Sequence, residues 1–154
     1  MMLTPTMHRF TYFMISEKYD NPRFYDSRFY WDILTACVRM GFLATLQLFQ
    51  KHGFGIYIYN YPIIGDRRTE LMLLSITHKR LEICRFLDND ATTRLDPILL
   101  QYAVRKNSYE IVLFLTARGI DVRYGEYKGL RLAYKMGYMD IARHLSDYEK
   151  TTNV

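Results

Sequence analysis

The chain contains an internal repeat, and a repeat restricts folding to units that bury their apolar sides against their neighbours. The clearest copies are AVRKNSYEIVLFL, which begins at Ala103, and AYKMGYMDIARHL, which begins at Ala133. Both have a small first residue, a turn residue four positions on, an acidic residue at seven, Ile at eight and Leu at twelve. SITHKRLEICRFL from Ser75 fits the same frame, and CVRMGFLATLQLF from Cys37 is a weaker copy. We therefore predict four copies of one unit, the last three spaced by 28 and 30 residues and the first followed by a longer connection, 38 residues before the second.

Each copy has the residue pattern of two short helices joined by a tight turn. In the third copy, Asp96 and Pro97 are typical of a helix start, because Asp caps free backbone N–H groups and Pro fits the first turn. Asn107 stands where this helix must end and reverse, a position that favours a residue tolerant of positive φ. A second helix follows, and Gly119 ends it. Four apolar residues of the second helices are expected to be buried between units: Ile111, Leu115, Ile141 and Leu145.

The turn position varies among the copies. Gly41 and Gly137 occupy it in two of them, and Lys79 is a departure that weakens the turn of the second copy. The small residue that opens each copy fits a place where helices approach closely. These small residues are Cys37, Ser75, Ala103 and Ala133.

These residues resemble the ankyrin repeat, in which a small residue and Gly precede an apolar residue, Glu, Ile-Val, two large apolar residues, Gly and a turn. The third copy matches best, as LLQYAVRKNSYEIVLFLTARGIDVR, although only Asp96-Pro97 echoes the family's Thr-Pro-Leu-His signature. The combination GIDVR…GLRLAYKMGYMDIARHL is similar to the shortened ankyrin repeats of giant DNA viruses. The resemblance covers residues 33–145. It implies protein–protein interaction and no cofactor.

The resemblance and the register together predict an all-α chain. We expect an ankyrin-like repeat solenoid of about four helix–turn–helix units with an N-terminal aromatic cap. Residues 1–32 are rich in aromatic side chains and form the cap, or alternatively an element that binds a partner. The expected units are residues 33–69, 70–95, 96–125 and 126–148, followed by a polar tail at 149–154 that we expect to fray.

The sequence favours a non-enzymatic protein. The four histidines do not lie at metal-ligand spacing from Cys, Glu or one another, and no Walker, GxGxxG or GxSxG motif is present. Cys37 and Cys84 lie in apolar helical patterns, as structural free thiols do. We therefore expect no catalytic residue, cofactor or metal. The apolar runs are too short for a signal peptide or membrane span, so we predict a cytoplasmic protein without membrane attachment, in the host cytoplasm if it is viral.

Basic residues are the best candidates for binding. Arg39, Arg105 and Lys135 follow the small residue of their copies by two positions, and Arg131 precedes one by two. In an ankyrin-like stack these positions would line the concave face, although a solvated helix face that aids solubility explains them too. Tyr57 and Tyr59 lie in the long connection after the first copy, where they either contact a partner or pack onto the stack.

The net charge of +5 favours an acidic partner. We predict another protein with an acidic surface. The alternative is a basic nucleic-acid-binding or particle-associated structural protein. Nucleic acid is the weaker reading, because acidic residues are interspersed with the basic ones. Arg94 and Arg123 follow second helices, and we expect them to brace neighbouring loops.

Overall fold

The computed structural model describes residues 28–51, 67–88 and 94–152. Eight helices account for most of these residues and no strand occurs among them, which confirms the prediction of an all-α chain for this part of the sequence. The expected cap up to residue 27 and the tyrosine-rich connection, with Tyr57 and Tyr59, lie outside the described residues.

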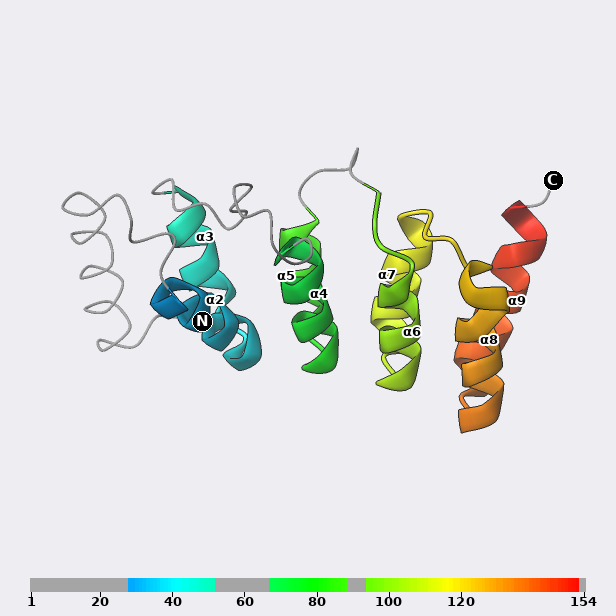
Figure 1. Ribbon diagram of the computed structural model, residues 1–154. Coiled ribbons are helices and arrows are strands. Elements are labelled where there is room, and N and C mark those ends of the chain that lie inside the picture. Colours follow the sequence, from blue (N-terminus) through cyan, green and yellow to red (C-terminus); the bar gives the residue numbers. More distant parts are fainter. Residues whose placement is uncertain (1–27, 52–66, 89–93, 153–154) are drawn as a thin grey trace. The chain divides into compact units, whose positions relative to one another are not determined.

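The helices follow one another in pairs (Figure 1). The pairs are α2 (Arg28–Met40) with α3 (Leu43–Lys51), α4 (Arg67–Thr77) with α5 (Leu81–Leu87), α6 (Ile98–Arg105) with α7 (Tyr109–Ala117), and α8 (Tyr124–Met136) with α9 (Met139–Thr152). The chain divides into two compact units, Met1–Leu71 and Met72–Val154, and the division falls within α4. The first unit contains α2 and α3. The second contains α5 to α9.

All four turns between paired helices have the same backbone structure. The turn residue has positive φ in each case: Gly41 81°, Lys79 54°, Asn107 48° and Gly137 73°. The next residue donates its N–H to the carbonyl of the small residue five positions earlier, at 2.9 Å for Cys37, 2.8 Å for Ser75, 3.1 Å for Ala103 and 2.9 Å for Ala133. These bonds complete the helix C-cap in which a left-handed residue satisfies the last free carbonyls. The expected positive φ is confirmed, and Lys79 adopts it without being Gly or Asn.

The small residues and the apolar stripe of the second helices form the core. All four small residues are buried. A larger side chain at these positions would separate the closely packed helices. Ile111, Leu115, Ile141 and Leu145 are also buried, as predicted. In α3 the position of the first Ile holds Thr45, whose buried hydroxyl has no hydrogen-bond partner in the described residues.

In the second unit the helices form two layers. Helices α6 and α8 pack against each other, and α7 packs between α5 and α9. Helices α6 and α7, and α8 and α9, pack across the layers. Gly129 lies where α8 meets α6, and a Cβ there would be in ordinary van der Waals contact with the Leu100 side chain, at 3.4 Å. The second unit therefore has one surface made by first helices and another made by second helices.

Helix starts and ends differ from the expectations in three places. The backbone N–H of Ile98 donates to the Asp96 carboxylate at 2.9 Å, in line with the expected helix start. Helix α2 begins at Arg28, inside the segment expected to be a cap. Helix α9 continues to Thr152, so the expected polar tail is largely helical. It is held by the Tyr127 hydroxyl, which donates to Glu149 at 2.6 Å.

The beginning of α8 is the third difference. Gly125, Glu126 and Tyr127 all have left-handed φ and ψ, so the right-handed part of α8 begins after them. Left-handed conformation costs about 1–2 kcal/mol for each residue that has a side chain. The N–H of Tyr127 donates to the Arg123 carbonyl at 3.1 Å, and its hydroxyl bonds Glu149, so both ends of this residue are held.

The core position of Leu115 can be tested by truncation. Leu115→Ala should lower the free energy of unfolding by about 2–5 kcal/mol, the range for a fully buried leucine. Leu113 lies on the same helix and is 37% exposed, so Leu113→Ala should cost well under half as much. Denaturant unfolding followed by circular dichroism measures both. Equal losses in the two variants would contradict the helical register described here.

Candidate interaction surface

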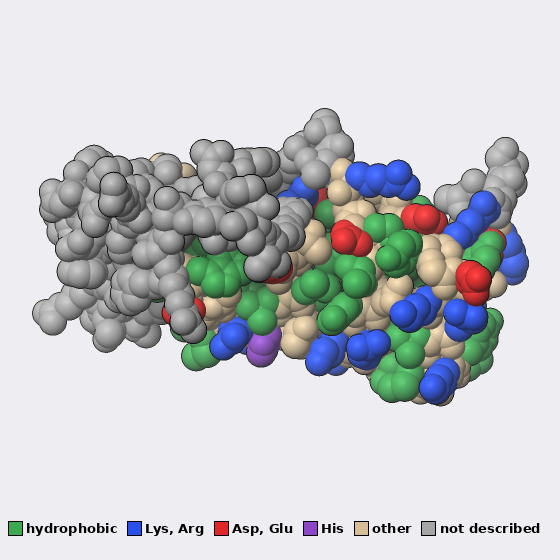
Figure 2. Space-filling model, in the orientation of Figure 1, with side chains coloured by type: hydrophobic (Ala, Val, Ile, Leu, Met, Phe, Trp, Pro, Cys, Tyr) green, Lys and Arg blue, Asp and Glu red, His purple; other side chains and the backbone are tan. Residues whose placement is uncertain are grey.

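The first-helix layer of the second unit has a strongly basic surface. Lys128, Arg131 and Lys135 are exposed on α8 and share one helical face, because residues three, four and seven apart lie on the same side. Arg105 ends α6, and Lys106 follows it. Figure 2 shows Lys and Arg side chains over α8 and along the lower edge of α6 and α8. We call the surface formed by these five residues the α6–α8 face.

Most of these cations are not neutralised by neighbouring carboxylates. Arg131 lies 3.9 Å from Glu126, but both side chains are largely exposed, which makes such a pair weak. The Arg105 guanidinium lies over the Tyr102 ring, 5.6 Å from its centroid. Lys106, Lys128 and Lys135 have no ion-pair partner in the described part of the chain. With five cations and one carboxylate on these two helices and the turn, the face attracts anionic groups.

The structure brings together three of the six residues predicted to bind a partner. Arg105, Arg131 and Lys135 lie on the neighbouring helices α6 and α8. Arg39 is exposed on α2 in the first unit. Tyr57 and Tyr59 fall outside the described residues.

Sequence reasoning missed two members of the face and misjudged a related position. Lys106 and Lys128 were not predicted, although the spacing of Lys128, Arg131 and Lys135 is helical and could have revealed the stripe. Gln101 occupies the position two before the small residue, which was expected to be exposed, but it is only 8% exposed. It is buried because the left-handed turn at the start of α8 packs onto it: a Cβ on Gly125 would lie 3.7 Å from Gln101 Nε2.

Loops of the second unit are braced by an ion pair that was not foreseen. Arg118, which follows α7, donates Nε and Nη2 to the carboxylate of Asp88, which follows α5. The Asp88 side chain is 3% exposed and that of Arg118 24%, so this pair is shielded from water. Arg123 lies 3.8 Å from Glu149, a looser contact, and Arg94 has no partner among the described residues. Arg94 therefore does not hold a neighbouring loop as expected, and the ion pair of Arg118 with Asp88 connects the loops instead.

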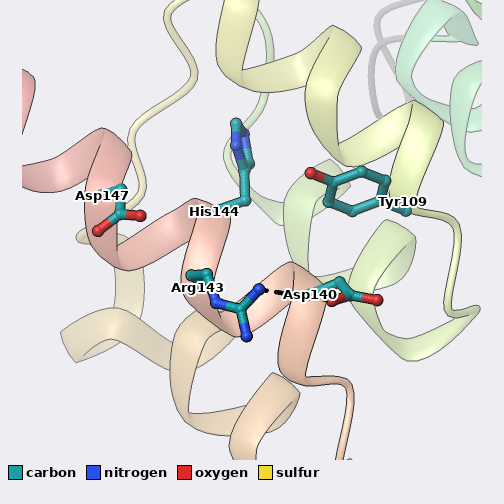
Figure 3. Close-up of a pocket in the computed structure, with 5 residues that line it drawn as sticks. All are labelled: Tyr109, Asp140, Arg143, His144 and Asp147. Atoms are coloured by element: carbon teal, nitrogen blue, oxygen red, sulfur yellow. Dashed lines mark ion pairs between the residues drawn. The ribbon is translucent and has the colours of Figure 1, made fainter.

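The second-helix layer contains a pocket around His144 (Figure 3). Its volume is ≈ 280 Å³, and it is lined by Tyr109 of α7 and by Asp140, Arg143, His144 and Asp147 of α9. Figure 3 shows Arg143 directed toward Asp140, 3.9 Å away, with Asp147 on the other side of His144. The Tyr109 and His144 rings meet edge to face, with 6.0 Å between centroids.

His144 is held in one orientation by Thr116. The Thr116 hydroxyl donates to a backbone carbonyl of its own helix, and its oxygen lies 2.8 Å from His144 Nε2. That oxygen can accept only if Nε2 carries the proton. Burial lowers the pKa of His144 from 6.5, and the Asp147 carboxylate partly opposes this. The imidazole is therefore neutral at physiological pH and tied to a structural hydroxyl.

The cysteines lack the features of nucleophiles. Burial raises the pKa of Cys37 to about 11 and that of Cys84 to about 12, which disfavours the reactive thiolate. In residues 28–51, 67–88 and 94–152, no three His, Cys, Asp or Glu side chains gather as metal ligands would. Over the same ranges, no helix has the length and apolar character needed to cross a membrane.

Comparison with known proteins identified no relative: no protein-family model, curated protein sequence or solved structure matches the chain.

The half-buried position of His144 predicts a pH-dependent stability. Because its pKa is lower in the folded state, the unfolded chain binds more protons below pH 6.5. The contribution of His144 to stability should therefore fall as the pH drops from 6.5 through the folded-state pKa, and stay constant above 6.5. His144→Gln removes this titration. Urea unfolding of both proteins from acidic to neutral pH should show the wild type losing more stability on acidification. A stability difference that does not change with pH would contradict the burial of the imidazole.

Proposed function

We propose that the chain is a non-enzymatic interaction module of ankyrin-repeat type, whose α6–α8 face binds an acidic surface of another protein. The cationic stripe on α8, continued by the end of α6, is the observation that carries this proposal.

The shared turn supports the repeat part of the proposal. Four helix pairs reverse through the same left-handed turn, and in each pair the small residue accepts the closing hydrogen bond. One turn structure recurring at one sequence register is the mark of a repeated unit. In the second unit the first helices pack side by side, so that cations from separate copies become neighbours. The buried reduced cysteines favour a cytoplasmic location, and the shortened repeat remains similar to viral ankyrin repeats.

A protein partner is favoured over nucleic acid by the composition of the face. Lys135 is flanked in α8 by Tyr134 and Met136, two large apolar or aromatic side chains that are exposed. Protein interfaces are enriched in Tyr, Met and Arg at their centres. A surface that binds nucleic acid instead depends on many contacts between cations and phosphates. The α6–α8 face has five cations and one carboxylate, so it can make few such contacts.

Charge reversal tests the proposal. Affinity capture from the source cell with the purified full chain yields a partner, whose affinity is then measured against salt concentration. Arg105→Glu with Lys135→Glu should weaken that binding by about tenfold or more and remove most of its salt dependence. The double variant should fold normally, since surface substitutions change stability by about 0.5 kcal/mol or less.

A matched control carries the same charge change elsewhere. Arg143→Glu with Lys150→Glu reverses two exposed cations of α9 and should leave binding intact. Native affinity in the Arg105–Lys135 double variant would show that the α6–α8 face is not the binding surface. Saturable binding of generic duplex DNA at moderate salt, lost in the same variant, would favour the nucleic-acid alternative.

A further inference from the structure

A second cationic site lies at the connection from α7 to α8, the end of these helices opposite the turn between α8 and α9 (Figure 1). A pocket of ≈ 260 Å³ is lined there by residues 119–122 together with Arg94, Arg123 and Tyr148. Arg94 lies shortly before α6 and Arg123 directly before α8. The two arginines thus come from equivalent connections of successive helix pairs and converge on one pocket.

Arg94 has no carboxylate beside it in the described part of the chain, and Arg123 has only a long ion pair with Glu149. Arg94 is exposed and makes no ion pair or hydrogen bond within the described ranges. Arg123 lies 3.8 Å from Glu149, beyond hydrogen-bond distance. That carboxylate already accepts a hydrogen bond of 2.6 Å from the Tyr127 hydroxyl. Arg118 on the same edge is different, because its Nε and Nη2 both donate to the Asp88 carboxylate.

Two residues that line the pocket have backbone N–H groups without a partner in the described structure. Among the described residues, the N–H groups of Asp121 and Val122 have no hydrogen-bond acceptor. Asp121 also provides the one carboxylate of the described lining, and it accepts the backbone N–H of Arg123 at 2.9 Å. Two guanidiniums therefore face two carboxylates, Asp121 in the lining and Glu149 beside Arg123, and each carboxylate already accepts a hydrogen bond. The guanidinium of Arg94 and the N–H groups of Asp121 and Val122 keep donors that an anion can use.

We propose that this pocket binds a phosphate monoester. A guanidinium presents paired N–H donors that match phosphate oxygens, and two guanidiniums can donate to several oxygens of one phosphate. A carboxylate has one charge and two oxygens, so it would leave one arginine and the backbone donors unused. The pocket is larger than a phosphate group, and Tyr148 provides a ring beside which the group that carries the phosphate can lie. This site is independent of the function proposed for the α6–α8 face.

Phosphate binding can be measured on the full chain with isotope-labelled protein. Titration with inorganic phosphate at constant ionic strength should produce saturable shifts of the amide signals of residues 119–123. Acetate should shift them at least about tenfold less effectively, because it cannot engage both arginines. A phosphoserine peptide distinguishes the source: tighter binding than inorganic phosphate indicates a phosphate carried by a partner protein, and equal binding indicates a free phosphate compound. Both results support the pocket.

Two variants complete the test. Arg94→Gln should weaken phosphate binding by about tenfold without unfolding the chain, since Arg94 makes no contact that the fold requires. Arg123→Gln should do the same, and Arg85→Gln, at an exposed arginine of α5, serves as the control. Shifts that fail to saturate would overturn the proposal. So would unchanged phosphate affinity in Arg94→Gln, or acetate binding as tightly as phosphate.

Discussion

Left-handed backbone at one residue determines how each helix pair is built. A right-handed helix that ends in such a residue reverses sharply, because the following N–H returns to a carbonyl in the last turn. Here that carbonyl belongs to the buried small residue in all four pairs, from Cys37 to Ala133. The turn and the packing therefore depend on the same residue. The small residue accepts the hydrogen bond of the C-cap, and its small side chain allows the helices to pack closely.

The surfaces of the second unit follow from these reversals. Each short turn brings the end of a first helix close to the start of a second, and cations such as Arg105 and Lys135 fall at those ends. Cations are favourable there, because the helix C-terminus carries partial negative charge. The longer connections lie at the other end, where Asp88 and Arg118 form a shielded pair and Arg94 and Arg123 border a pocket. The helix pairs thus place Arg105 and Lys135 at one end of the helices, and Arg94 and Arg123 at the other end.

The sequence predicted what depends on local chemistry and register. It located the turn residues, the buried Ile111 and Leu115 and the helical class. These features depend on residues close together in the sequence: a turn residue that tolerates positive φ, and apolar residues at helical spacing. It missed the pair of Asp88 with Arg118, whose partners are 30 residues apart and belong to no periodic pattern. It also missed the left-handed turn at the start of α8, since two of its three residues, Glu126 and Tyr127, have side chains that disfavour positive φ. Half of the predicted binding residues share the α6–α8 face, and Lys128 joins them because it lies one turn before Arg131 on the same side of α8.

The dependence of the fold on left-handed turns is tested most directly by opposite substitutions at two of them. Lys79→Gly should raise the free energy of unfolding by about 0.5–1 kcal/mol, because relief of the left-handed strain exceeds the added flexibility of glycine. Gly137→Ala should lower it by about 1 kcal/mol through backbone strain alone, since a Cβ there would meet no atom within 4 Å. Denaturant unfolding of the two variants and the wild type gives both values. Changes of opposite sign agree with this account, and destabilisation by Lys79→Gly together with no effect of Gly137→Ala would contradict it.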